Sequence, residues 1–146
     1  SDPLVAKLAG ATFDITEYVV DIAKKEGLAP GMQPLGGDIA IHLPCHSRAQ
    51  NMGQKGAEML RLIPEAKVGV VERCSGHGGK WGIFKENFDR AVKVGKPAAR
   101  NLVKTNPDMI VSECPLAGPH LKQVIAANGS SQSNLSRSNT ASLFQD

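Results

Sequence analysis

The chain has 146 residues, of which 41% are hydrophobic, 21% charged and only 4% aromatic. This length favours a single domain, whose core must be built mainly from aliphatic side chains. A formal net charge of +3 is too small to predict a nucleic-acid-binding protein, and no apolar run approaches the ~18 residues that a membrane span needs. The first ten residues, SDPLVAKLAG, also lack the long apolar stretch of a secretory signal.

Helical and strand patterns follow one another along the chain. A first helix is predicted to begin at Asp14, because Glu17 follows it at the spacing of a capping box. The Pro- and Gly-rich stretch 28–37 indicates a loop. Short runs rich in β-branched residues predict strands over 38–43, 67–72 and 108–113. Further helices are predicted over 50–63, 85–95, 97–106 and 121–129, with Pro97 at a first helical position.

This alternation predicts an α/β fold: a parallel sheet of short strands with flanking helices, in a Rossmann-like three-layer arrangement with right-handed crossovers. We expect this domain to occupy residues 11–128. Residues 1–10 are expected to be a lead or the end of a cut linker. The serine-rich stretch 129–146 holds few core-forming residues, so we predict a disordered tail.

The cysteines are few and widely separated: Cys45, Cys74 and Cys114. A secreted disulfide framework would have a dense, even set, so free or metal-binding thiols in a reducing, cytoplasmic compartment are the better interpretation. Each cysteine comes just after a predicted strand. Because parallel strands end at the same edge of a sheet, we expect the three thiols to meet there. Thiolates suit zinc or an iron–sulfur cluster, although a single free cysteine is often only a small buried hydrophobe.

The neighbours of the cysteines add candidate ligands. After Cys74 comes a glycine-rich loop in which Ser75 and Gly76 are candidates for contacting a bound group. His46 and His77 lie beside cysteines, and either is a candidate fourth metal ligand. His120 is a weaker candidate. His42 is inside a predicted strand, where a histidine with satisfied hydrogen bonds is the more common finding.

These motifs resemble a known family. The segments HLPCH, ERCSGHGGKWGIFKEN and VSECPLAG resemble the cysteine-rich CCG domain, the iron–sulfur module found in one of the subunits of anaerobic glycerol-3-phosphate dehydrogenase and of heterodisulfide reductase. The resemblance covers about residues 11–127. It is closest to the glycerol-3-phosphate dehydrogenase branch, where a Gly-x-x-Gly and a Lys-Glu-Asn follow the Cys-Cys-Gly loop.

The chain departs from the family pattern at two positions. The family's cysteine doublet is Cys74-Ser75 here, and its closing Cys-x-x-Cys ends in Ala117. With three of five cysteines present, a non-cubane pair of clusters is not expected. The resemblance instead implies one 4Fe-4S cluster held by three thiolates and a histidine, a serine oxygen or an open position. A mononuclear zinc or iron with three cysteines and a histidine is the alternative.

The resemblance implies an electron-transfer module of an oxidoreductase rather than a self-sufficient enzyme, and it assigns no catalytic residue. The module would relay electrons between a flavoprotein dehydrogenase partner and a quinone or other redox carrier, with peripheral contact to the inner face of the membrane through that partner. The alternative is a zinc-binding structural or interaction domain that kept the fold without redox chemistry. A thiol reductase with Cys74 as nucleophile is disfavoured, because no second cysteine lies nearby in the sequence.

Overall fold

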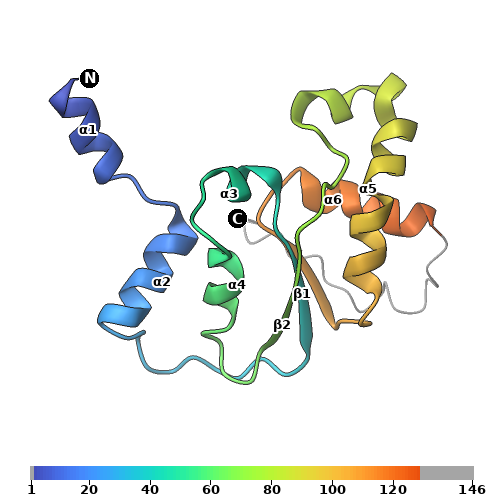
Figure 1. Ribbon diagram of the computed structural model, residues 1–146. Helices are drawn as coiled ribbons and strands as arrows, with labels where there is room; N and C mark the ends of the chain where they lie inside the picture. Colours follow the sequence, from blue (N-terminus) through green and yellow to red (C-terminus); the bar gives the residue numbers. More distant parts are fainter. Residues whose placement is uncertain (1, 129–146) are drawn as a thin grey trace.

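The computed structural model of the protein describes residues 2–128, which form an α/β architecture around one parallel sheet (Figure 1). Its strands are β1 (Asp38–His42), β2 (Lys67–Val71) and β3 (Met109–Ser112). The strand order is β2-β1-β3, so β1 is central and pairs with a neighbour on each side. The predicted fold class is confirmed, and all three strands lie within one residue of their predicted limits.

Helices cover both faces of the sheet. In chain order they are α1 (Pro3–Gly10), α2 (Ile15–Lys25), α3 (Cys45–Ala49), α4 (Lys55–Leu60), α5 (Phe88–Val103) and α6 (Ala117–Ala127), with two 3-10 helices, η1 (Gly79–Ile83) and η2 (Lys85–Asn87), before α5. Figure 1 shows α2 and α4 on one side of the sheet and α5 and α6 on the other. Within residues 2–128, no helix is both long and apolar enough to span a membrane.

The core has two halves that meet at β1. Ile39 and Ile41 pack with Leu60 and other aliphatic residues on the α4 side, whereas Ala40 packs with α5 and α6 on the opposite side. Four of the five residues of β1 are buried, as expected for a central parallel strand covered on both faces. Leu102 of α5 is fully buried. This packing fixes the position of the strand ends, from which the cysteine loops leave.

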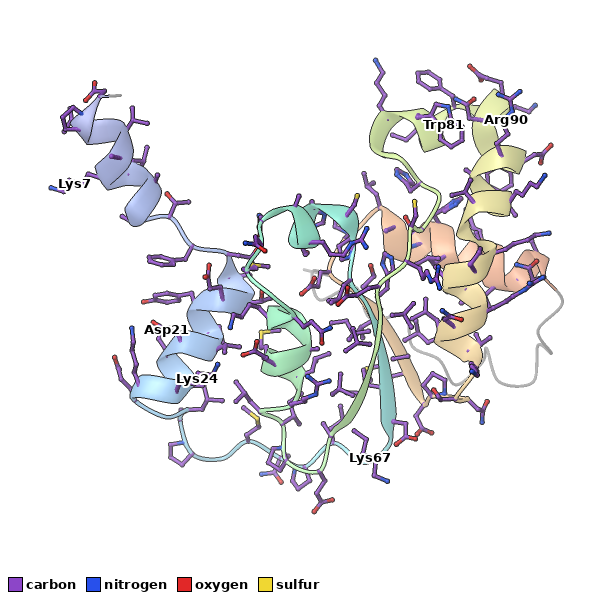
Figure 2. All side chains as sticks on the ribbon, in the orientation of Figure 1. Lys7, Asp21, Lys24, Lys67, Trp81 and Arg90 are labelled. Atoms are coloured by element: carbon purple, nitrogen blue, oxygen red, sulfur yellow. The ribbon has the colours of Figure 1, made fainter. Side chains whose placement is uncertain are left out.

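Asp14 caps α2, as predicted. Its carboxylate accepts hydrogen bonds from the backbone nitrogen of Thr16 at 2.9 Å and from the Thr16 hydroxyl at 2.7 Å. The bonded residue is therefore the second of the helix, whereas a capping box would use the third. Lys24 of α2, labelled in Figure 2, forms an ion pair with Glu58 of α4 at 2.9 Å. This pair is solvent-exposed and contributes little stability.

The predicted helix over 50–63 is wrong in its first half. A short helix, α3, begins earlier at Cys45, and α4 covers only Lys55–Leu60. Asn51 adopts a left-handed φ of 54°, a conformation that ends a right-handed helix. A turn therefore separates α3 from α4, and α4 packs against the sheet.

The two helices predicted over 85–95 and 97–106 form one helix, α5, with Pro97 inside it. A proline inside a helix costs about 3 kcal/mol, and the burial of Ala91, Ala98 and Leu102 along one face of α5 offsets that cost. The last helix, α6, begins at Ala117, four residues earlier than predicted. Proline is tolerated in the first turn of a helix, so Pro119 does not delay this start.

The predicted domain limits are not tested by the fold. Residues 3–10 form α1, which has no buried side chain and lies apart from the sheet in Figure 1. The predicted disordered tail over 129–146 lies outside the described residues. Both limits therefore stay predictions.

Candidate metal centre

The three cysteines lie where their strands end. Cys45 and Cys74 each follow the last residue of their strand by three positions, and Cys114 follows β3 by two. Because the strands are parallel, all three residues belong to the carboxyl edge of the sheet. Figure 2 marks the two ends of the molecule: Lys67 begins β2 at the amino edge, and Trp81 follows the Cys74 loop at the opposite end. The three thiols are free, and Cys45 and Cys74 are exposed.

Backbone amides donate hydrogen bonds to two of the sulfur atoms. The Gly76 nitrogen lies 3.4 Å from Cys74 Sγ, and the Ala117 nitrogen lies 3.4 Å from Cys114 Sγ. Such bonds stabilise a thiolate, which is the form that binds metal. Ala117 has no ligand atom in its side chain, but its backbone amide donates a hydrogen bond to Cys114 Sγ. The sequence carried no signal of this role, because it depends on where α6 begins.

A close backbone contact holds the Cys74 loop against α5. Gly76 has a φ of +83°, and a Cβ placed on it would overlap the Ala91 carbonyl oxygen and lie 2.7 Å from the Gly95 nitrogen. A Cβ on Gly95 would in turn overlap the Ser75 carbonyl oxygen. Ser75 also accepts a hydrogen bond on Oγ from the His77 nitrogen at 3.3 Å. The predicted contact residues Ser75 and Gly76 therefore shape the loop.

His42 is buried at the end of β1 with both ring nitrogens hydrogen-bonded. Nδ1 lies 3.0 Å from Ser112 Oγ, and Nε2 lies 2.9 Å from the Arg73 carbonyl oxygen. The interpretation of His42 as a satisfied core histidine is therefore confirmed. Burial is the main cause that lowers the pKa of His42 below its ordinary value, and the bond to the Arg73 carbonyl opposes it.

The lowered pKa of His42 predicts that acid destabilises the protein. In the unfolded chain this histidine titrates near 6.5, so below that pH the unfolded state binds more protons than the folded state. The stability that the neutral, buried His42 contributes is therefore fully present above the unfolded pKa and is lost as pH falls through the lower pKa of the folded state. We expect a smaller free energy of unfolding at about pH 5.5 than at about pH 7.5 in urea titrations. The difference should shrink in the non-titrating His42→Gln variant. Equal pH dependence in both proteins would contradict this prediction.

The other three histidines differ in their surroundings. His46 is exposed in α3, whereas His77 is partly buried in the Cys74 loop. The rings of His77 and His120 lie edge to face with centroids 5.8 Å apart. Burial lowers the pKa of His120, opposed by its hydrogen bond to the Ala91 backbone and reinforced by His77. His120 thus lies beside His77, and its role as a ligand stays a prediction.

Two side chains in the described part of the chain carry buried polar atoms without a hydrogen-bond partner. Within residues 2–128, the buried side-chain nitrogen and oxygen atoms that lack a hydrogen bond belong to Glu113 and His120. Leaving such an atom unpaired costs about 1–3 kcal/mol, so native proteins rarely keep one without a reason. His120 is only 5% exposed, and its free atom is Nε2. His120 Nε2, on a ring beside that of His77, is therefore a donor atom available to a bound group, whereas the Glu113 carboxylate lies against Gly56 of α4.

The donors do not gather around one point. Among the described residues, no three Cys, His, Asp or Glu side chains are close enough together to hold a single metal ion. The fold brings Cys45, Cys74 and Cys114 to one edge, with His77 and His120 beside one another.

Comparisons with known proteins identify a family. The family model described as "Cysteine-rich domain" (CCG) matches residues 39–122, which include all three cysteines. A subunit of the anaerobic glycerol-3-phosphate dehydrogenase of Escherichia coli is 30% identical over 90 residues, 61% of this chain and 23% of the relative. An uncharacterized iron-sulfur protein of Methanocaldococcus jannaschii is 33% identical over 111 residues, 75% of this chain and 21% of the relative.

A third relative is a subunit of the dihydromethanophenazine:CoB–CoM heterodisulfide reductase of Methanosarcina acetivorans. It is 29% identical over 114 residues, 73% of this chain and 27% of the relative. The chain thus spans about a quarter of the length of these relatives. No solved structure matches the chain. From the family model that covers more than half of its length, we conclude that the chain belongs to the cysteine-rich CCG domain family.

Proposed function

We propose that the chain is an iron–sulfur electron-transfer module of an oxidoreductase. The observation that carries this proposal is the set of free cysteines at one sheet edge, two of which accept amide hydrogen bonds on sulfur. Family membership and the names of the relatives, an iron-sulfur protein and two oxidoreductase subunits, support it. For the centre we propose one 4Fe-4S cluster.

The residues present fit such a group. Cys45, Cys74 and Cys114 would each bind one iron through sulfur. The unpaired Nε2 of His120 and the partly buried ring of His77 are available as a nitrogen donor, in addition to the exposed His46. When bound, the cluster supplies the capacity to take up and release single electrons. The amides of Gly76 and Ala117 would donate hydrogen bonds to the two ligating sulfur atoms, and the contact of Gly76 with α5 holds the loop in place.

A single zinc ion is the less favoured alternative. Zinc binds thiolate at about 2.3 Å in tetrahedral geometry, so two thiolates on one zinc lie within about 4 Å of each other. In a cluster each thiolate binds a different iron atom, so the sulfur atoms are further apart. The name of one relative, an iron-sulfur protein, favours the cluster.

The partners follow from the same proposal. An electron-transfer module needs an electron donor and an acceptor, and we propose a flavoprotein dehydrogenase and a quinone or similar carrier. We place the module in the cytoplasm, with contact to the inner face of the membrane made through the partner. The oxidoreductase names of two relatives support a multi-subunit setting.

Electron paramagnetic resonance tests the proposed redox chemistry. The protein purified without oxygen should give a cluster signal that dithionite creates and mild oxidation removes. Because fewer thiolates raise the potential of an iron–sulfur centre, Ser75→Cys, which restores the family's cysteine doublet, should lower the midpoint potential. Replacement of the distant exposed Lys25 by serine serves as the control. A protein with full metal content and no redox-dependent signal would contradict the proposal.

A further inference from the structure

His42 connects all three cysteine segments through hydrogen bonds and chain connectivity. It lies at the end of β1, three residues before Cys45. Its Nε2 meets the carbonyl of Arg73, the residue directly before Cys74. Its Nδ1 meets the hydroxyl of Ser112, two residues before Cys114. The ring is 1% exposed, so water does not compete for these bonds.

The partners fix the direction of each hydrogen bond. A carbonyl oxygen only accepts, so His42 Nε2 must carry the hydrogen and donate it to Arg73. In the neutral ring Nδ1 then accepts, and the Ser112 hydroxyl donates to it. Ser112 Oγ also accepts from the Cys114 nitrogen at 3.4 Å. The result is a continuous relay from the Cys114 amide through Ser112 and His42 to the Arg73 carbonyl.

We propose that His42 and Ser112 are positioning residues that set the relative placement of the three cysteines. This inference rests on the proposed function for its purpose, but the relay itself depends only on the fold. Burial lowers the pKa of His42, which keeps the ring in the neutral form that the relay requires. His42 and Ser112 are also register partners in the pairing of β1 with β3. The relay therefore acts at the carboxyl end of that strand pair.

A comparison of Ser112 variants tests the relay. Ser112→Ala removes the hydroxyl, whereas Ser112→Thr keeps it on a side chain that suits a strand. Thr16→Val is the control for general destabilisation, because Thr16 is a buried hydroxyl residue in α2 with its own hydrogen bond to Asp14. His42→Gln is a second disruptive variant, since its amide reaches the Arg73 side only.

The first measurement is iodoacetamide alkylation of the chelator-treated full chain, resolved by cysteine with mass spectrometry. Ser112→Ala removes both the bond from the Cys114 amide and the bond to His42. The rate at Cys114 should therefore rise at least roughly fivefold, the factor that corresponds to the loss of one hydrogen bond. Cys45 should react at the wild-type rate, and Ser112→Thr and Thr16→Val should match wild type at Cys114. Unchanged Cys114 reactivity in Ser112→Ala, or an equal rise in Thr16→Val, would overturn the inference.

The second measurement is the midpoint potential and paramagnetic line shape of the iron-loaded protein. Both should shift in Ser112→Ala and His42→Gln and stay at the wild-type values in Ser112→Thr and Thr16→Val. Identical spectra in all variants would overturn the positioning role. If wild type forms no cluster, the proposed function fails, while the alkylation rates still decide whether the relay holds the Cys114 segment.

Discussion

Replacement of any one of the three cysteines by alanine is expected to abolish binding of the metal centre. Each thiolate would hold a different part of the group, and no other cysteine exists in the chain to take its place. Iron content of purified Cys45→Ala, Cys74→Ala and Cys114→Ala, measured beside wild type, checks this. Full iron in all three variants would show that the carboxyl edge of the sheet is not the site.

The two histidine variants are expected to differ in metal content. Only one of His46→Ala and His77→Ala should lose the metal, and the structure favours His77, which is partly buried beside His120. His46 is exposed in α3 and has no such neighbour among the described rings. If both variants kept full metal, the remaining ligand would have to be His120, Ser75 or a group from outside the chain.

Replacement of Gly76 by alanine should be strongly destabilising although it leaves every candidate side-chain ligand in place. The new Cβ would overlap the Ala91 carbonyl oxygen, and the φ of +83° is unfavourable for alanine. Overpacking costs about 1–3 kcal/mol, and the left-handed backbone about 1–2 kcal/mol more. We expect a clear drop in the denaturation midpoint together with loss of iron, because the Cys74 loop can no longer lie against α5.

Gly79→Ala separates these two costs. Gly79 also has a left-handed φ, +58°, but a Cβ there meets nothing within 4 Å. This variant should show only the backbone cost of about 1–2 kcal/mol and keep its iron. Urea denaturation of both variants and their iron content provide the comparison. Equal destabilisation by the two substitutions would mean that the contact between the Cys74 loop and α5 is unimportant.

Local patterns were sufficient to predict the sheet and the placement of the cysteines. The β-branched runs are short, bounded by loops and separated by helical stretches, so the position of Cys45, Cys74 and Cys114 after their strands followed directly. Helix limits were harder, because they depend on tertiary contacts. Pro97 stays inside α5 since the helix buries an apolar face against the sheet, a benefit that a residue-by-residue pattern does not contain.

The hydrogen-bond relay at His42 could not be predicted from the sequence, for a similar reason. A histidine in a strand is readily predicted to be buried, but its partners depend on strand order and register. His42 meets Ser112 because β1 and β3 are neighbours with these residues paired, although they are 70 positions apart in the chain. The amide of Ala117 reaches Cys114 only because α6 begins there.

The central claim is that this chain holds an iron–sulfur cluster, and a count of iron, acid-labile sulfide and zinc per chain tests it most directly. The protein should be purified without oxygen and its protein concentration determined by amino-acid analysis. We predict a brown protein with iron and sulfide in equal amounts, about four of each per chain for one 4Fe-4S cluster, and no stoichiometric zinc. A colourless protein with one zinc per chain and no sulfide would contradict the account.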